Sequence, residues 1–208
     1  MRATLTALGV CVLLAAGPAS ADVWSDSYDP ATKTRFIPVE LWTGSAWDGA
    51  RTITTPKADL SFDRGKRITG PHDWTDPLDG QVKQVYQRYE PRSRKTQFFM
   101  VRADGTGIGR VDDSRWKDIE RGESKFPAGL WTQGEVRTYD IETYGKTSKK
   151  RIDLVVQVRM IMEDIDHTYA GNAHCMRFRW QLTVRTRLAD NNAYTYCPGK
   201  GLASLDDD

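Results

Sequence analysis

The sequence is poor in the residues and motifs by which catalytic sites are usually recognised. Its 208 residues include only three histidines and three cysteines. None of them stands in a CxxC or HExxH metal spacing or beside a GxSxG nucleophile motif. The glycines at 105, 107 and 109 are not followed by the helix that a nucleotide phosphate would need. We therefore expect no metal and no cofactor, and a binding role is favoured over an enzymatic one.

An excess of either charge is also missing. The chain has 30 basic and 28 acidic residues and a formal net charge of +2, which provides no general attraction to nucleic acid. Charged residues make up 28% of the chain, and seven tryptophans are present. Disordered chains are poor in aromatic residues. The composition thus predicts a folded protein without a nucleic-acid partner.

Long apolar runs are absent except near the start. The run at residues 5–16 has about a dozen residues, whereas a membrane helix needs roughly 20. Arg2 precedes it, and Ala19-Ser20-Ala21 follows it after a helix-breaking Gly17-Pro18. These are the three parts of a secretory signal peptide. We expect cleavage near Ala21 and a mature chain that is not an integral membrane protein. An uncleaved membrane anchor is the alternative.

Cleavage of a signal peptide at residues 1–21 would leave one mainly β domain, residues 22–208, in the periplasm or outside the cell. It would also remove Cys11, so that only Cys175 and Cys197 remain. Two cysteines in an oxidising compartment most simply form one disulfide. Two free or metal-bound thiols are the alternative, because a histidine precedes Cys175.

The clearest structural pattern lies in the last third of the chain. Every second residue is apolar over residues 152–162 and again through most of residues 176–188. This period is typical of half-buried strands, and Ala170-Gly171-Asn172 is a turn signal. We predict a long antiparallel hairpin that turns near His167. Arms of more than ten residues twist, so we expect a strongly curved antiparallel sheet, either a barrel or a half-barrel.

The remaining elements are shorter, and their spacing is typical of an all-β protein. Ser114 to Gly122 has the start and stop signals of a helix, so the all-β class includes at most one short helix. A turn at Asp190-Asn191-Asn192 would end the hairpin's second arm, and a last strand through Cys197 would be joined to the hairpin by the disulfide. Strands are predicted at residues 35–42, 51–55, 59–62, 82–89, 96–103 and 136–143.

The two faces of the predicted hairpin offer two binding surfaces. The apolar face is either core or the wall of an open cavity for an acyl chain or another apolar ligand. Methionines, which adapt to irregular ligands, lie near one end of it. The candidate ligand-binding residues of this face are Met160, Met162, Met176, Phe178 and Trp180.

The opposite face gathers arginines, among them Arg177 and Arg179. With a turn near His167, Arg159 would lie opposite a residue near Arg177. Such a cluster is suited to the phosphate or carboxylate groups of an anionic envelope polymer. A solvated outer face, neutralised by acidic neighbours, is the alternative.

Two further groups are weaker candidates. The loop at residues 71–80 carries His72 and three aspartates, which suit a divalent cation, but their spacing is not that of an EF-hand and favours a turn. Exposed tryptophans on a β scaffold could stack on sugar rings. The tryptophans considered are Trp24, Trp42, Trp47 and Trp74.

Several segments resemble known proteins. Residues 36–44 and 47–49 are similar to uncharacterised exported proteobacterial proteins. Residues 126–134, 169–171 and 196–202, the last reading Tyr-Cys-Pro-Gly-Lys-Gly-Leu, resemble periplasmic domains with a curved antiparallel sheet like that of lipoprotein carriers. The resemblance implies a curved-sheet binding protein and assigns no functional residue.

Together these patterns favour an exported cell-envelope protein with a binding or structural role, which holds an apolar or lipid-like ligand on a curved sheet. The alternatives are an envelope hydrolase with an unrecognised active site and a module that binds carbohydrate or an anionic polymer. A deep cleft with a histidine and a carboxylate would favour the hydrolase. An open apolar cavity without titratable groups would favour the carrier.

Overall fold

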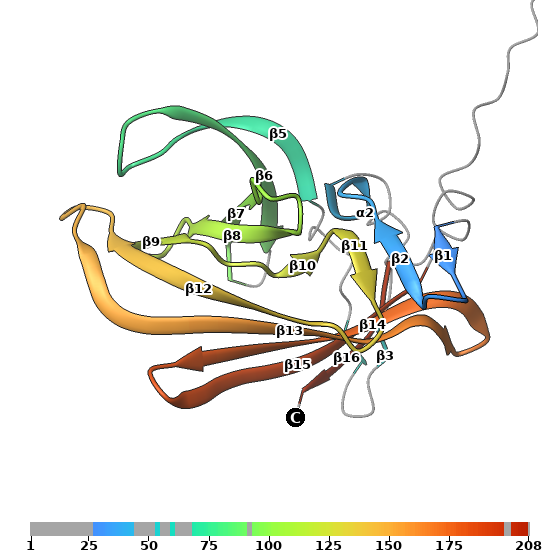
Figure 1. Ribbon diagram of the computed structural model, residues 1–208. Coiled ribbons are helices and arrows are strands. Elements are labelled where there is room, and N and C mark those ends of the chain that lie inside the picture. Colours follow the sequence, from blue (N-terminus) through green and yellow to red (C-terminus); the bar gives the residue numbers. More distant parts are fainter. Residues whose placement is uncertain are drawn as a thin grey trace, which may run out of the picture.

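The computed structural model describes residues 27–43, 53–54, 59–60, 68–90, 93–197 and 201–207. In this part of the chain all strand pairs are antiparallel, and the single helix is the one-turn α2 (Glu40–Thr43) (Figure 1). The predicted fold class is confirmed. The predicted signal peptide lies outside the described residues, as do Trp24 and Trp47.

The first large sheet has five strands in the order β10-β8-β7-β6-β5. It curls into a half-barrel, which Figure 1 shows in green above the long C-terminal strands. Its strands are β5 (Ile68–Thr75), β6 (Val82–Glu90), β7 (Lys95–Val101), β8 (Gly107–Asp113) and β10 (Phe126–Pro127).

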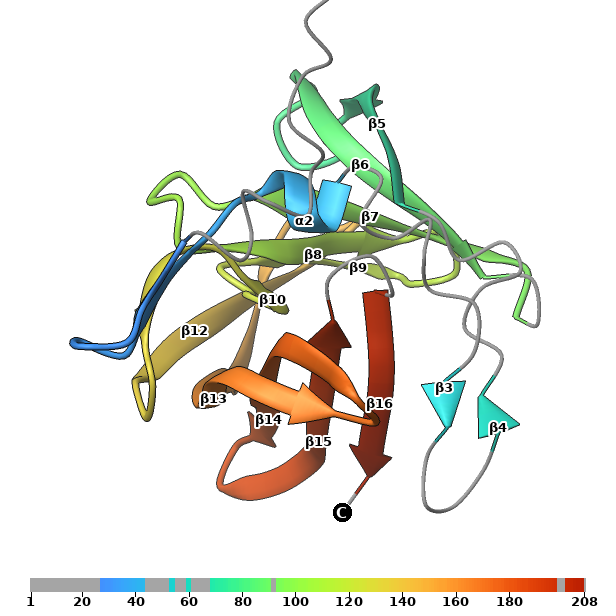
Figure 2. The same cartoon turned by 90° about the vertical axis from the view of Figure 1, so that its right-hand side faces the viewer.

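The second large sheet has six strands in the order β16-β15-β14-β13-β12-β9. Figure 2 shows its last strands, in orange and red, below the green half-barrel. Its strands are β9 (Asp118–Arg121), β12 (Val136–Gly145), β13 (Arg151–Tyr169), β14 (Asn172–Val184), β15 (Arg187–Cys197) and β16 (Gly201–Asp207). Two small sheets complete the fold: β1 (Tyr28–Asp29), β2 (Thr34–Ile37) and β11 (Gly129–Thr132) form one, and β3 (Ile53–Thr54) and β4 (Asp59–Leu60) form the other.

Strands β13 and β14 are the predicted hairpin, and its turn lies at the Ala170-Gly171 turn signal rather than near His167. The turn is the pair Ala170-Gly171, and both residues have positive φ, as two-residue hairpin turns require. The register is therefore shifted, and Arg159 lies opposite Gln181 while Arg177 lies opposite Asp164. The expectation that Arg159 pairs near Arg177 was wrong.

The end of the hairpin's second arm was also misplaced. Strand β14 ends at Val184, and Arg185-Thr186 form the turn into β15. The predicted turn at residues 190–192 instead lies within β15, where Asp190 pairs with Leu182 and Asn192 with Trp180. Asparagine and aspartate are turn formers in general, but here the long β14 supplies them with a strand partner.

The curvature of the sheet follows from a break in the alternation of β13. Buried side chains alternate up to Met162, after which the register with β14 shifts three times before Tyr169. Such bulges bend a strand and increase its twist. Beyond the break Ile165 becomes the buried residue. The 19-residue strand can therefore follow a curved path along the core.

The predicted helix at residues 114–122 was wrong. This segment contains β9, which pairs with β12 through Glu142–Arg121 and the three following residue pairs. The Ser114 hydroxyl does not cap a helix but accepts a hydrogen bond from the Thr96 N–H at 2.9 Å. Ile119 is fully buried. Strand pairing and burial, which are long-range interactions, override the local helix signals.

The hydrophobic core lies between the two large sheets. From α2, Trp42 inserts against Phe126 and Tyr196, with ring-centre distances of 5.2 Å and 4.7 Å. The methionine and aromatic side chains proposed from the sequence as a ligand face belong to this core and are 2% exposed or less: Met160, Met162, Met176, Phe178 and Trp180. That these five residues bind a ligand stays a prediction.

The disulfide is confirmed. Cys175 of β14 and Cys197 at the end of β15 are bonded, with an S–S distance of 2.05 Å. The alternative of free or metal-bound thiols does not hold for this pair. A disulfide is consistent with an oxidising compartment outside the cytoplasm. In the described part of the chain, no helix is long and apolar enough to cross a membrane.

Candidate functional site: a cleft at the end of the core

The segment at residues 122–128, here called the cross-over segment, follows β9 and includes β10. It positions Glu123, one of the residues that line the site. It passes over β8 at Gly107 and Gly109, where an added Cβ would overlap the Ser124 hydroxyl and the Glu123 carbonyl oxygen. Glycine in a strand often marks such a close approach of two backbones. The glycine pattern at 105, 107 and 109 thus has a structural reason at its last two positions.

Three buried tryptophans fix the cross-over segment. The indole N–H of Trp180 donates to the Ser124 carbonyl at 3.0 Å, and that of Trp131 donates to the Ala128 carbonyl at 2.9 Å. Trp42 donates in the same way to the Pro127 carbonyl. Buried indoles and carbonyls are stable only when they are hydrogen-bonded. These bonds hold the segment, and with it Glu123, in one place.

Beside this segment lies a cleft of about 460 Å³, within the usual range for small-molecule sites. Its apolar floor belongs to the six-stranded sheet. Ile141, Val156 and Val184 form one row across β12, β13 and β14 in direct register, and Leu154 and Leu182 extend the floor. The floor continues the apolar face of the hairpin, but here the face is not fully covered.

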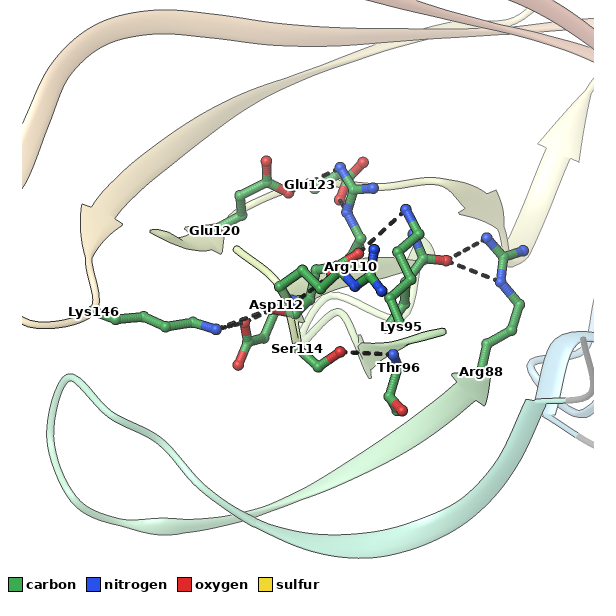
Figure 3. Close-up of polar contacts among 12 residues, drawn as sticks. Arg88, Lys95, Thr96, Arg110, Asp112, Ser114, Glu120, Glu123 and Lys146 are labelled. Carbon is green, nitrogen blue, oxygen red and sulfur yellow. Dashed lines mark hydrogen bonds and ion pairs between the residues drawn. The ribbon is translucent and has the colours of Figure 1, made fainter. Parts of the chain in front are cut away.

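The connection between β8 and β9 and the first residue of β9 also line the cleft, with Arg115, Trp116, Lys117 and Asp118. Lys146 binds the end of β8, just before this connection: its Nζ lies 2.5 Å from Asp112 Oδ1 and donates to the Asp113 carbonyl at 3.0 Å (Figure 3).

The polar wall of the cleft consists of Arg110, Glu120 and Glu123. Figure 3 shows Glu120 and Glu123 close to the Arg110 guanidinium. Its NH2 group lies 3.5 Å from Glu120 Oε2, and its Nε lies 3.6 Å from Glu123 Oε2. The guanidinium carbon also lies 3.8 Å from the centre of the Trp116 ring, which is a close cation–π contact.

Two atoms of this wall lack a hydrogen bond. The side chain of Glu123 is only 1% exposed, yet its Oε2 has no hydrogen-bond partner among the described residues, and neither has Arg110 Nε. Buried polar groups without a partner are rare and costly. Both residues line the cleft, and the buried donor and acceptor lie 3.6 Å apart, so a polar group of a bound molecule that reaches them would satisfy both.

Burial and charge shift the titration of this group. Burial, followed by the charge of Glu123, raises the pKa of Glu120 to about 8, and a hydrogen bond with Glu123 adds to the effect. Burial and the charge of Arg110 lower the pKa of Lys125 to about 8, and its Nζ lies 4.6 Å from the Trp180 ring centre. At neutral pH Glu120 is therefore protonated.

A second, smaller cavity of about 240 Å³ lies next to the cleft. Met100, Val101 and Arg102 contribute to it, and it shares Arg110 and Glu123 with the main cleft. The Arg110–Glu123 pair thus borders both cavities.

The arginines proposed from the sequence as an anion site are engaged within the protein. Arg177 Nε and Arg179 Nε lie 2.9 Å and 2.6 Å from the two carboxylate oxygens of Glu163. Glu163 thus serves as the anion for both guanidinium groups. Whether the two arginines also bind a polymer stays a prediction.

The remaining candidates are held by neighbouring side chains. The loop expected at residues 71–80 is in part a strand, because His72 lies in β5 and pairs with Val85. After β5, Asp76 is fully buried and forms ion pairs with Lys83, at 2.5 Å, and with Arg121. Trp42 belongs to the core, so the interpretation of this residue as an exposed sugar platform was wrong. Trp74 packs on Phe98 with a ring-centre distance of 6.2 Å.

The histidines lie away from the cleft. Near the hairpin tip, His174 Nδ1 lies 2.9 Å from Asp166 Oδ1, and Asp166 in turn binds the buried Arg35 at 3.0 Å. No group of three or more metal-ligating side chains is found in the described ranges. The histidine expected of a hydrolase cleft is thus not among the residues lining this one.

Comparisons with protein-family models, with curated proteins and with solved structures give no match to this chain. The resemblance seen in the sequence therefore stays an expectation.

Proposed function

We propose that the protein binds a small, largely apolar molecule in the cleft between its two large sheets, in an oxidising compartment of the cell envelope. The supporting observation is the uncovered end of the hairpin's apolar face. Leu154, Val156, Leu182 and Val184 line an open cleft there, whereas the rest of the same face is closed. Apolar side chains that line a concave surface of this size are typical of ligand sites.

The polar wall gives the ligand an orientation. An apolar chain on the floor loses water contact, and this is favourable by about 25 cal/mol for each Å² of apolar surface buried. Arg110 and Glu123 can then bind one polar group of the ligand, because both line the cleft and each has an unpaired atom. The compartment is supported by the Cys175–Cys197 disulfide.

Calorimetric titration with eight-carbon amphiphiles of different head groups tests this proposal. Val184→Trp should fill the cleft and abolish binding. Val155→Trp is the matched control, because Val155 lies one residue from the floor residue Val156 and is 65% exposed, so binding should be retained. Binding that survives Val184→Trp, or no binding of any amphiphile, contradicts the proposal.

Hydrolysis is a second candidate, favoured by one observation. Glu120 has a pKa raised to about 8 and lies beside a second carboxyl group, that of Glu123, and paired carboxyl groups can serve as acid and base. Their hydrogen-bonded contact leaves less room than the roughly 5 Å or more between the carboxyl groups of glycoside hydrolases. Turnover of chromogenic esters or glycosides that is lost in Glu120→Gln, with binding retained, would establish this candidate.

A further inference from the structure

The unpaired atoms of the polar wall are complementary to one chemical group. Arg110 Nε is a hydrogen-bond donor and Glu123 Oε2 is an acceptor; they lie 3.6 Å apart, and neither has a hydrogen-bond partner among the described residues. A single oxygen that accepts from the first and donates to the second would satisfy both. An oxygen at ordinary hydrogen-bond lengths of about 2.8 Å from each atom is compatible with their 3.6 Å separation.

We propose that the Arg110–Glu123 pair receives the hydroxyl group of an uncharged, apolar ligand, so that the cleft recognises an alcohol rather than a charged amphiphile. This inference rests on the proposed function of the cleft and names the head group of its ligand.

The charge of the wall supports a neutral head group. The guanidinium of Arg110 and the carboxylate of Glu123 balance each other, and the nearby Glu120 is neutral below about pH 8. A ligand carboxylate would be attracted by Arg110 but repelled by Glu123, and an ammonium group would meet the reverse. Either ion would also lose its hydration in an apolar cleft, which is costly. A hydroxyl group avoids both penalties.

Contacts with neighbouring residues also hold Arg110 and Glu123 in position to bind the ligand hydroxyl group. Arg110 packs on the Trp116 ring at 3.8 Å, and the carbonyl of Ser124, next to Glu123, accepts the hydrogen bond of the buried Trp180 indole. Because these contacts limit how far the two side chains can move, the hydrogen bonds to the ligand should discriminate strongly.

Four eight-carbon probes distinguish the head groups: 1-octanol, its isomer heptyl methyl ether, octanoate and octylamine. The ether can accept from Arg110 but cannot donate to Glu123. We expect 1-octanol to bind roughly 10- to 100-fold more tightly than the ether, as for the loss of a hydrogen bond to a charged group. Octanoate and octylamine should bind more weakly than 1-octanol at pH 7.

The variant Glu123→Gln removes the charge of the acceptor while keeping its shape. It should narrow the difference between alcohol and ether to a few-fold. Val155→Trp, outside the cleft, should leave that difference unchanged. A folded Glu123→Gln protein, judged by circular dichroism, with an unchanged difference would overturn the inference.

The outcomes separate this inference from the proposed function. If alcohol and ether bind equally, and Val184→Trp abolishes both, the cleft binds apolar molecules and the head-group assignment is wrong. Tighter binding of octanoate or octylamine would likewise overturn it. If none of the four probes binds, the proposed function is wrong and the inference is wrong with it.

Discussion

The two ends of one apolar face have different roles. Toward the hairpin tip the face carries Met160, Phe178 and Trp180, which pack against the half-barrel and are closed to solvent. Toward the other end it carries Leu182 and Val184, which line a cleft. The strands and their alternation are the same at both ends. The two ends differ in what packs on them. Aromatic side chains and the cross-over segment cover the closed end, whereas the polar wall borders the cleft at the open end.

This difference shows how a sheet face becomes a site. Period-two alternation determines which side chains point inward, but it does not determine whether anything lies on them. The aliphatic end is left open because β8 and β9 present Arg110 and Glu120 there rather than apolar side chains. The following predictions test the contrast between the two ends, from the largest expected effect to the smallest.

Phe178→Ala at the closed end should lower the free energy of unfolding by about 3–5 kcal/mol, because it leaves a cavity in a tightly packed core. Leu182→Ala at the open end should lower it by only about 1 kcal/mol, because this side chain already faces the cleft and is half-buried. Urea melts of both variants measure the contrast. Equal losses would mean that the two ends are packed alike.

Removal of the disulfide by the double change Cys175→Ser and Cys197→Ser should lower the free energy of unfolding by about 3 kcal/mol. The bond closes a loop with a sequence separation of 22 residues, and in the chain-entropy model this constrains the unfolded state. The cleft is remote from this bond, so binding of 1-octanol to the folded variant should be unchanged. A loss of 1-octanol binding without a loss of stability would contradict the prediction that the disulfide stabilises the fold and leaves the cleft unchanged.

The polar wall should give the stability a pH dependence. The pKa of Glu120 is raised from 4.5 to about 8 in the folded protein, so the folded state keeps a proton that the unfolded chain releases. Stability from this group is therefore full below about pH 4.5 and is lost as the pH rises to about 8. Relative to the wild type, Glu120→Gln should gain stability between pH 5 and pH 8, as measured by thermal melts. A constant difference over this range would exclude the protonated glutamate.

The smallest effect is expected on the outer face. Arg179→Ala removes one of the two ion pairs of Glu163 and should lower the free energy of unfolding by about 0.5–1 kcal/mol, as partly exposed ion pairs do. Arg159→Ala, whose side chain is exposed in the same sheet, is the matched control and should change it by less than about 0.5 kcal/mol. A loss of several kcal/mol in Arg179→Ala would place this face in a buried interface.

The sequence allowed the hairpin, the disulfide and the fold class to be predicted, because these depend on local alternation and on two cysteines. The candidate site could not be predicted. Its wall depends on contacts between distant residues, such as the hydrogen bond of Trp180 to Ser124, 56 positions away. The helix expected at residues 114–122 also obscured Glu120. The available signal was the glycine pair 107 and 109, which marks a close backbone approach.

Methyl NMR during a titration with 1-octanol tests the central claim most directly, because it observes both ends of the apolar face in one experiment. We predict that the methyl signals of Leu154, Leu182 and Val184 shift on binding and that those of Met160, Met162 and Met176 do not. Shifts confined to the methionines would place the ligand in the closed core and contradict the assignment of the cleft.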